Sequence, residues 1–385
     1  PSATVTTVPD ALEVARRIGY PVLVRPSYVL GGRSMEIVYD PDTLAAFMAQ
    51  VLELFPGNQI LIDKFLEDAV EVDVDCIADG RRCVICGVME HIEEAGIHSG
   101  DSACVLPPST LERAVVRRIE DQTRRIAREL GVVGLMNVQF AVKNGVVYVL
   151  EVNPRASRTI PFVSKATGVS FARLATEVML GKTLDELRVT RKKTVRHVAV
   201  KESVFPFTRF PGITISLGPE MKSTGEVMGI DDTFEMAFAK SQAASGSPLP
   251  TSGNVFISVH DAYKDKIVDV ARSFKDLGFT IFATAGTASC LSEHGIEVAT
   301  VMKVSEGRPN VADEIMNGRI HLLINVSLGR RPTMDAALIR RYALRSGVPY
   351  TTTVAAARAM AAAIGELKKR TFRVKSIQEY HGMEA

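Results

Sequence analysis

A run of small and turn-forming residues divides this chain into two parts with different secondary-structure rhythms. The run SGSPLPTSG, near residues 245–254, has no apolar periodicity and is rich in serine, glycine and proline, as linkers are. Domains usually hold roughly 100–200 residues, so a chain of 385 residues has room for two or three of them. We therefore expect a first domain over 1–245, a linker over 246–254 and a second domain over 255–385.

Before the linker, the alternation typical of strands dominates over helical periodicity. Gly131 follows the longest helical pattern, in the usual place of a C-terminal cap. Several strand patterns follow one another without a helix between them, which favours an α+β unit with a largely antiparallel sheet. The strand patterns lie at 21–27, 35–40, 59–66, 69–78, 135–142 and 146–153, and the helical ones at 10–19, 42–54, 110–130 and after Pro161.

After the linker, strand and helix patterns alternate regularly. Strands that are separated by helices in sequence usually form a parallel sheet with helices on both faces. We therefore expect a small, complete α/β domain. Its strand patterns lie at 254–259, 279–284, 298–304, 321–327 and 350–353.

Composition and charge argue against several classes of protein. With 46 basic and 44 acidic side chains the formal charge is +2, and no basic stripe marks a nucleic-acid binder. The most apolar run, VAAARAMAAAIG at 354–365, contains Arg358 and is shorter than the roughly 20 residues that a membrane helix needs. The chain begins at Pro1 without methionine and soon enters a helical pattern, so we expect a fragment of a longer protein.

The cysteines indicate a reduced, cytoplasmic compartment, because their number is odd and no secretory signal accompanies them. Cys83 and Cys86 have the CxxC spacing of zinc and redox sites. They lie in a strand pattern, however, where positions i and i+3 point to opposite faces. We interpret them as buried apolar side chains. The full set is Cys76, Cys83, Cys86, Cys104 and Cys290.

The stretch VLEVNPRASRT at 149–159 places Glu151, Asn153 and Arg155 at alternate positions of an apolar strand pattern. The turn KNG at 143–145 decides which residues of the preceding strand share their face. A two-residue Asn-Gly turn would pair Gln139 with Leu150 and mix polar with apolar side chains.

A three-residue turn over 143–145, with Gly145 left-handed, shifts the register by one and separates the two kinds of side chain. We prefer this turn for that reason. It would place Asn137, Gln139, Glu151 and Asn153 together on a polar face. The apolar face would hold Met136, Val138, Phe140, Val142, Val146, Tyr148, Leu150 and Val152.

The oxygen-bearing side chains of Gln139, Glu151 and Asn153 suit a hard divalent cation that keeps several waters and is completed by nucleotide phosphates. Arg155, one strand step further, could contact a terminal phosphate through its planar guanidinium. The alternative is a solvated polar face with an incidental ion pair. This strand alone does not decide between the two.

Two further clusters favour the phosphate site. Arg25 ends a strand pattern, and the turn after it contains Gly31 and Gly32, which let backbone N–H groups approach an anion. The stretch EHIEEAGIHSGDSAC at 90–104 interrupts the sheet pattern and predicts a functional loop. His91 and His98 are zinc ligands by type, but they lack a helical or CxxC frame, so we do not expect zinc.

These motifs together resemble the ATP-grasp enzymes, and specifically the C-terminal half of the carbamoyl-phosphate synthetase large chain. The resemblance extends over essentially the whole chain, because the part after the linker is similar to the family's methylglyoxal-synthase-like allosteric domain. It implies attack of carbamate on the γ-phosphate of ATP, a step of the arginine and pyrimidine pathways. The motifs are YPVLVRPSYVLGGRSMEIV, KFLEDAVEVDVD, MEHIEEAGIHSGDSACVLPP, GLMNVQFAVKNGVVYVLEVNPRASRTIPFVSKATG and GPEMKSTGEVMG.

The resemblance also implies the site residues. Arg25 and Arg155 would be catalytic, with Arg25 at the phosphates and Arg155 beside the transferred phosphoryl group. Gln139, Glu151 and Asn153 would hold Mg²⁺ or Mn²⁺. A potassium ion would bind near Glu71, His91 and Glu93. The other ATP contacts would come from Lys64, Leu66, Glu71, Gly96, Ile97, His98 and Ser99, alongside Arg25, Gln139 and Glu151.

Two effector sites are implied as well. Thr284 and Thr287 lie between a strand end and a helix start, where open N–H groups favour a phosphate. They belong to the set that matches the family's pocket for IMP and UMP, namely Ser258, Lys264, Thr284, Thr287, Lys303, Asn325 and Ser327. Acidic groups suit the ammonium groups of ornithine. The residues that match its site in bacterial members are Glu93, Asp101, Glu202, Tyr350 and Thr352.

The chain departs from the family at Lys64, where relatives often have His or Arg, and at Ser327, where Thr is common. The family implies further partners: the N-terminal half of the same large chain, a glutaminase small subunit, and other copies in an oligomer. The fragment by itself would be inactive in the full reaction. Two alternatives stay open, another ATP-grasp carboxylase such as a biotin carboxylase, and a non-catalytic fragment that binds nucleotide effectors.

Overall fold

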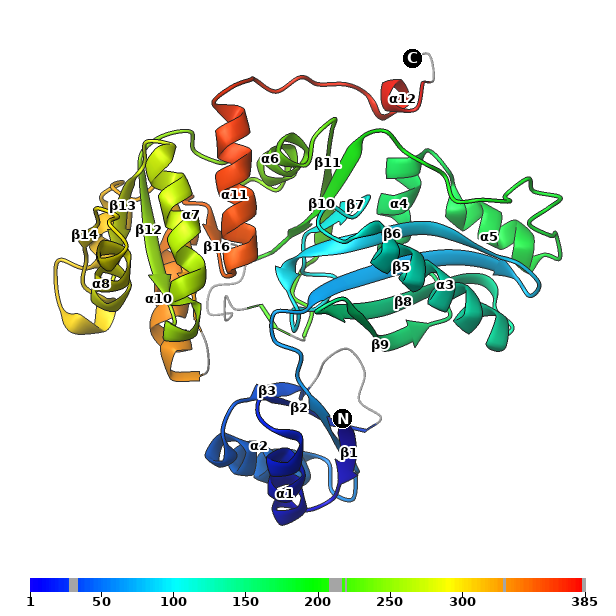
Figure 1. Ribbon diagram of the computed structural model, residues 1–385, viewed down its shortest axis with the longest axis horizontal. Helices are drawn as coiled ribbons and strands as arrows, with labels where there is room; N and C mark the ends of the chain where they lie inside the picture. The colour runs from blue at the N-terminus through cyan, green and yellow to red at the C-terminus, as the bar shows by residue number, and fades with distance from the viewer. Residues whose placement is uncertain (28–33, 208–216, 219, 328–329, 383–385) are drawn as a thin grey trace.

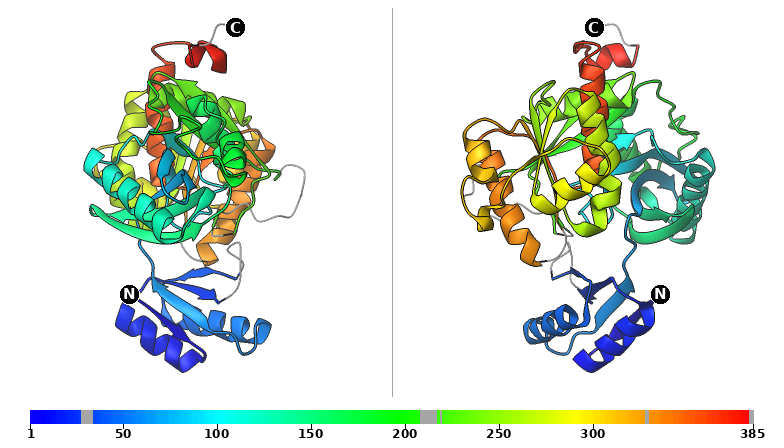
Figure 2. Two further views of the ribbon diagram at one scale, coloured as in Figure 1. Left: turned by 90° about the vertical axis from the view of Figure 1, so that its right-hand side faces the viewer. Right: turned by 60° about the vertical axis from the view of Figure 1, so that its left-hand side comes forward.

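The computed structural model describes residues 1–27, 34–207, 217–218, 220–327 and 330–382, and its strands form three sheets (Figure 1). A four-stranded sheet forms an N-terminal lobe, a seven-stranded sheet forms the body, and a five-stranded sheet forms the C-terminal domain. The N-terminal lobe stands apart from the body in every view, and the segment between its last strand and the body joins the two (Figure 2).

The N-terminal lobe is a small antiparallel sheet with both of its helices on one face. Its strands β1 (Ser2–Val5), β2 (Val22–Pro26), β3 (Glu36–Val38) and β4 (Ile60–Lys64) lie in the order β1-β4-β2-β3. The helices α1 (Val8–Ile18) and α2 (Pro41–Leu54) begin at side-chain caps from Thr7 and Asp40. Their apolar sides close one core with alternate residues of β2 and β4.

The body is an antiparallel sheet covered by helices on both faces. α3 (Arg113–Glu129) packs on one face, and α4 (Ile160–Thr167) and α5 (Phe171–Met179) pack on the other. The strand order is β11-β10-β7-β6-β5-β8-β9. The strands are β5 (Val70–Asp79), β6 (Cys83–Glu94), β7 (Cys104–Leu106), β8 (Val133–Lys143), β9 (Val146–Asn153), β10 (Val198–Val204) and β11 (Gly225–Asp231).

The C-terminal domain has the predicted parallel sheet with helices on both faces, in the strand order β14-β13-β12-β15-β16. α7 (Lys264–Asp276), α8 (Ala285–Glu293) and α11 (Val354–Leu367) pack on one face, and α9 (Val311–Met316) and α10 (Arg330–Arg345) on the other. The strands are β12 (Asn254–Val259), β13 (Thr280–Ala283), β14 (Ala299–Thr300), β15 (Leu322–Val326) and β16 (Tyr350–Thr351). The predicted fold class is therefore confirmed for both units.

The predicted linker joins two units that share a hydrophobic core. Phe238 of α6 (Phe234–Ala244) belongs to the same buried cluster as Ala357 of α11, on the far side of the linker. The chain then returns from α11 to the body and ends beside α4 (Figure 1). There Tyr380 of α12 (Ile377–Tyr380) donates to the Ile230 carbonyl at 2.9 Å.

The β8–β9 hairpin corrects the predicted turn. Lys143 pairs with Val146, and Asn144 and Gly145 both have positive φ, so the turn has two residues. The three-residue turn was wrong. A β-bulge at position 150 supplies the missing shift, because Phe140 pairs with Val149 while Gln139 pairs with Glu151.

The position of the bulge decides which side chains reach the core. Gln139, Glu151 and Asn153 share a face as predicted, since they lie beyond the bulge. Between the turn and the bulge the prediction failed: Val146, Tyr148 and Leu150 were expected on the apolar face, yet they are 49%, 41% and 44% exposed. Val147 packs against the core instead, whereas Val152, beyond the bulge, packs there as predicted.

Candidate functional site

Carboxylate and amide side chains form two parallel rows across β5, β8 and β9. One row runs from Asp73 through Gln139 to Glu151, because these residues are direct partners in the ladder. The second row runs from Asp75 through Asn137 to Asn153. β9 is the edge strand, so the rows pass from buried acids on β5 to an exposed Glu151.

The outer part of this polar face has the donor set of a divalent-cation site. Asn153 donates from Nδ2 to Glu151 Oε1 at 2.7 Å, and Gln139 donates from Nε2 to Ser99 Oγ at 2.8 Å. Both amides use their nitrogens, so within the described residues their oxygens receive no hydrogen bond. Two amide oxygens and one carboxylate fit Mg²⁺ or Mn²⁺ that also takes waters and phosphate oxygens. Across the same described residues, no group of three or more His, Cys, Asp or Glu could hold a metal ion.

The loop after β6 is fixed against this face. Gly96 N–H donates to Glu71 Oε1 at 3.1 Å, and the His98 N–H donates to the Gly218 carbonyl at 2.8 Å. Gly96 has φ +104°, and a Cβ there would meet Phe65 at 3.1 Å, so only glycine suits this position. The structure thus brings Glu71, His98, Ser99 and Gln139 together with the intervening Ile97.

A charged histidine is buried beneath the loop. His91 Nε2 lies 2.8 Å from Asp73 Oδ2, and its Nδ1 lies 3.5 Å from Glu71 Oε2. Burial disfavours the imidazolium, but the hydrogen bond to Asp73 and the negative charges of Asp73 and Glu71 outweigh it and raise the pKa of His91 to about 9. At neutral pH this pair of carboxylates therefore holds a cation of the chain's own. Glu93, the third residue of the predicted potassium site, is occupied in part by the Ala103 N–H at 2.7 Å.

The buried carboxylate of Asp75, like that of Asp73, was not predicted from the sequence. It accepts hydrogen bonds from Ser157 at 2.7 Å, Thr159 at 2.6 Å and Asn137 at 3.0 Å. These bonds tie the segment that follows Arg155 to the centre of the sheet. The alternation EVDVD at 71–75 was the available signal, because a strand with that pattern places all three carboxylates on one face.

Other predicted ATP residues lie on or near the N-terminal lobe. Arg25 Nε lies 3.5 Å from Asp63 Oδ2 on the neighbouring strand. Lys64 donates to the Gly19 and Tyr20 carbonyls at 3.0 and 2.8 Å, so its ammonium closes the end of α1. Leu66 lies in the segment that joins the lobe to the body.

The remaining residues predicted to contact phosphates lie either in the body, after β9, or outside the described residues. Arg155 is exposed after β9 and donates to the Ala156 carbonyl at 3.0 Å. The predicted Gly31 and Gly32 turn lies outside the described residues. The pieces of the predicted ATP site are thus divided between lobe and body.

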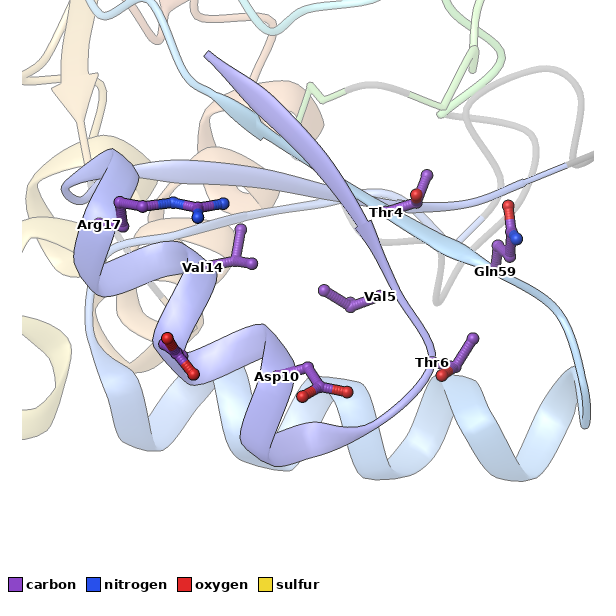
Figure 3. A pocket seen from close by; sticks show the side chains of 8 residues that line it. Thr4, Val5, Thr6, Asp10, Val14, Arg17 and Gln59 are labelled. Carbon is purple, nitrogen blue, oxygen red and sulfur yellow. The ribbon is translucent and has the colours of Figure 1, made fainter.

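The N-terminal lobe has a surface hollow of its own, of about 320 Å³ (Figure 3). It lies between β1 and α1 and contains none of the predicted site residues. Its lining is Thr4, Val5, Thr6, Asp10, Glu13, Val14, Arg17 and Gln59.

Comparison with known proteins identifies the family. Residues 1–187 match the family model described as the carbamoyl-phosphate synthase L chain, ATP binding domain, and residues 266–352 match the MGS-like domain. The carbamoyl phosphate synthase large chain of Archaeoglobus fulgidus is 57% identical over 373 residues, which cover 97% of this chain and 35% of that protein. The chain belongs to the carbamoyl phosphate synthase large-chain family.

Within that family the chain corresponds to the C-terminal section. The protein of Methanocaldococcus jannaschii named as that section is 51% identical over 98% of this chain and 63% of its own length. This chain spans about a third of the length of the large chains that it matches. The biotin carboxylase domain of Hydrogenobacter thermophilus 2-oxoglutarate carboxylase shares the ATP-grasp fold, with a TM-score of 0.52 over 63% of this chain, 61% of that chain and 17% identity.

A pocket lies between the ATP-grasp body and the MGS-like domain. Its volume is about 290 Å³. All five residues predicted for ornithine line it: Glu93, Asp101, Glu202, Tyr350 and Thr352. The first three come from the body, and the last two lie at β16 of the C-terminal domain.

Two of the carboxyl groups in this pocket have raised pKa values. Burial raises the pKa of Glu93 to about 7 and that of Glu202 to about 8, and the two carboxylates repel each other. Gln242 donates to Glu202, and the backbone N–H groups of Lys222 and Ser223 donate to Asp101 at 2.8 Å. A cationic ligand would stabilise the ionised forms of the two glutamates.

The predicted nucleotide residues of the MGS-like domain meet at one edge of its sheet. Ser258 and Asn325 are partners on β12 and β15, and Ser258 Oγ lies 3.2 Å from Thr284 Oγ1 at the start of α8. Asn325 is buried, and its Oδ1 accepts no hydrogen bond from any residue that the structure describes. Thr287 Oγ1 instead accepts from the Val259 N–H at 3.2 Å.

The outer members of that set are held by neighbouring acids. Lys264 Nζ lies 2.9 Å from Asp261, and Lys303 Nζ lies 3.9 Å from Glu306. Lys264 also reaches the start of α8, since a Cβ at Gly286 would lie 3.3 Å from its Nζ. Ser327 follows directly after β15.

In the described part of the chain, no helix is long and apolar enough to cross a membrane.

Proposed function

We propose that this section carries out the phosphorylation of carbamate by ATP, which yields carbamoyl phosphate and ADP. The observation that carries the proposal is the direct pairing of Gln139 with Glu151, with Ser99 of the loop bonded to the same amide. This arrangement places a carboxylate and amide oxygens beside the loop after β6, where Gly96 leaves room for a ligand to come close to the backbone. Such a surface suits the metal-bound phosphates of a nucleotide.

The chain's own residues would position the nucleotide. Gln139, Glu151 and Asn153 would hold Mg²⁺ or Mn²⁺, which when bound neutralises phosphate charge. Arg155, exposed one step beyond, would contact the transferred phosphoryl group through its guanidinium. From the lobe, Arg25 would contact phosphates. Leu66 would lie at the adenine, between lobe and body.

The partial reaction tests this proposal. In the complete large chain, Glu151→Gln should abolish ATP formation from carbamoyl phosphate and ADP, because the carboxylate that holds the metal is lost. Glu129→Gln, an exposed carboxylate on α3, is the matched control and should keep the activity. The ATPase reaction of the N-terminal half reports that the chain is folded. Undiminished ATP formation by Glu151→Gln would remove the site assignment.

We further propose that the C-terminal domain binds nucleotide effectors and that the pocket between the units binds ornithine. Support comes from the orphaned Asn325 Oδ1 beside Ser258 and Thr284, and from the acids of the inter-unit pocket. Calorimetry on the chain should detect IMP or UMP, and Thr284→Ala should weaken that binding alone. Glu202→Gln should weaken ornithine binding alone. No binding of any of the three compounds would contradict the assignment.

The alternatives make different predictions. Another ATP-grasp carboxylase would cleave ATP in a biotin-dependent manner, and similarity of over 50% to synthase large chains across both units argues against it. A purely regulatory fragment would bind effectors but leave the partial reaction to other parts of the enzyme. The proposed partners are the N-terminal section of the large chain, a glutaminase subunit and further copies in an oligomer.

A further inference from the structure

An arginine-lined hollow lies at the end of the body far from the proposed nucleotide site. It opens at the start of β6, whereas the loop of the proposed nucleotide site, which contains Gly96, His98 and Ser99, follows the end of β6. Twelve residues of strand at about 3.3 Å each separate the two by roughly 35 Å. Its volume is about 210 Å³, and its lining is Ala78, Gly80, Arg81, Arg82, Cys83, Arg124, Ala127, Arg128 and Val132.

The hollow has a strong excess of positive charge. Of the described residues that line it, four are arginines and none is acidic. Arg82 is paired with Asp185, and Arg124 with Glu120 and Asp121. The guanidinium groups of Arg81 and Arg128 make no ion pair within the described residues. Because like charges in one hollow repel each other, a bound anion would stabilise it, and planar guanidinium groups match carboxylate and phosphate geometry.

The hollow also contains the thiol of Cys83, which has a second cysteine beside it on the same face of the sheet. Cys83 lies opposite Ala78 in the ladder, so Cys76, two residues earlier on the same strand, shares its face. The thiol of Cys76 is buried and lies on the same face of the sheet as Cys83. The neighbouring Cys76 thiol lowers the pKa of the Cys83 thiol; burial opposes this shift, and the charges of Arg124 and Arg128 add to it.

We propose that this hollow binds small carboxylate- or phosphate-bearing anions, and that an anionic disulfide bound there modifies Cys83. Cys83 gives its proton to water, and its sulfur attacks one sulfur of the disulfide. The new bond to Cys83 forms as the sulfur–sulfur bond of the reagent breaks, and the other half leaves as a thiolate. The disulfide is the oxidant: Cys83 is oxidised to a mixed disulfide and the departing half is reduced.

A competition between reagents and between cysteines tests the proposal. The whole chain is treated with oxidised glutathione, which carries carboxylates, or with uncharged hydroxyethyl disulfide, and the modified peptides are quantified by mass spectrometry over time. Cys290 is the internal reference, since it is also partly exposed, but burial and then Asp265 and Glu293 raise its pKa. Cys83 should react first, and oxidised glutathione should gain roughly tenfold over the uncharged reagent at low salt.

Variants separate the anion site from general thiol reactivity. Arg128→Gln should lower the glutathione rate at Cys83 severalfold and leave the rate with the uncharged reagent closer to that of the parent chain. Arg125→Gln is the matched control, because Arg125 is exposed on the same helix but does not line the hollow. Raised salt should act like Arg128→Gln in the parent chain. Equal rates for both reagents, an equal loss in Arg125→Gln, or faster reaction of Cys290 would each overturn the proposal.

Discussion

Gln139 lies directly opposite Glu151 on the neighbouring strand, although the two-residue turn between their strands would by itself pair Gln139 with Leu150. The extra residue in the bulge at position 150 makes the difference. It leaves the side chains near the turn in one register and the polar residues near the strand end in another. The candidate metal site therefore depends on an irregularity within β9 rather than on the turn.

The bulge makes a prediction about stability. Leu150 is 44% exposed, so Leu150→Ala should change the free energy of unfolding by less than about 0.5 kcal/mol. Phe140 is fully buried on the partner strand, so Phe140→Ala should lower the free energy of unfolding by about 3–5 kcal/mol. Urea denaturation of the two variants beside the parent chain provides the measurement. A loss of 2 kcal/mol or more in Leu150→Ala would support the register with the three-residue turn instead.

Sequence reasoning reached the fold class and the polar face, because alternation in a strand states directly which residues share a side. It failed on the turn, since an added residue at 143 and an added residue at 150 place Gln139, Glu151 and Asn153 on one face equally well and differ only for the residues between the turn and the bulge. The alternation EVDVD likewise indicates that Asp73 and Asp75 share one face of a strand. Their hydrogen-bond partners, His91 and Thr159, are distant in sequence, so the pattern does not predict these contacts.

The rest of the body was harder to predict. β10 and β11 complete the seven-stranded sheet, yet a long stretch separates them from the strands they extend. The inter-unit pocket joins Glu93 and Glu202 of the body to Tyr350 of the other domain. No pattern within one segment indicates such a contact, and only the resemblance to the family suggested these residues together.

The acids of the inter-unit pocket predict pH-dependent ornithine binding. Burial raises the pKa of Glu93 to about 7 and that of Glu202 to about 8, so both are largely protonated at pH 6 and ionised above pH 8. A cationic ligand favours the ionised forms. Affinity should therefore rise as pH increases from 6 to 8.5, by up to roughly tenfold per pH unit for each proton released.

Calorimetry in two buffers of different ionisation enthalpy would count those protons. Glu202→Gln should bind more weakly, and it should also release fewer protons and flatten the pH profile. The same affinity at pH 6 and pH 8.5 in the parent chain would show that neither glutamate changes its charge on binding.

The buried His91 predicts a loss of stability at alkaline pH. Burial opposes the charge, but the hydrogen bond to Asp73 and the charges of Asp73 and Glu71 raise the pKa of His91 from 6.5 to about 9. A raised folded-state pKa stabilises the protein fully below pH 6.5, and this contribution disappears as pH rises through 9. Its size is on the order of 3 kcal/mol.

The test compares the parent chain with His91→Gln at pH 7, 8, 9 and 10. The parent chain should be more stable at pH 7, and the difference in unfolding free energy should shrink toward pH 10 as the imidazolium loses its proton. A difference that stays constant over this range would show that His91 is neutral in the folded protein.

Arg340 of α10 is a buried charge whose replacement by an apolar side chain is expected not to lower the free energy of unfolding. Its side chain is buried, and among the described residues neither Nε nor Nη2 has a hydrogen-bond partner. Burial lowers the pKa of Arg340, and the nearby Tyr350 only partly opposes this. A buried cation with unpaired donors costs several kcal/mol, whereas an apolar side chain of similar length keeps the packing without that cost.

Arg340→Met should therefore leave the free energy of unfolding unchanged or raise it by about 1–3 kcal/mol, measured by urea denaturation without effectors. Arg341→Met, at the exposed neighbouring position, is the control and should stay within about 0.5 kcal/mol of the parent chain. A loss of more than 1 kcal/mol in Arg340→Met alone would mean that the guanidinium has an acceptor in solution. Its position near Tyr350, which lines the inter-unit pocket, makes ornithine titration of this variant the natural second measurement.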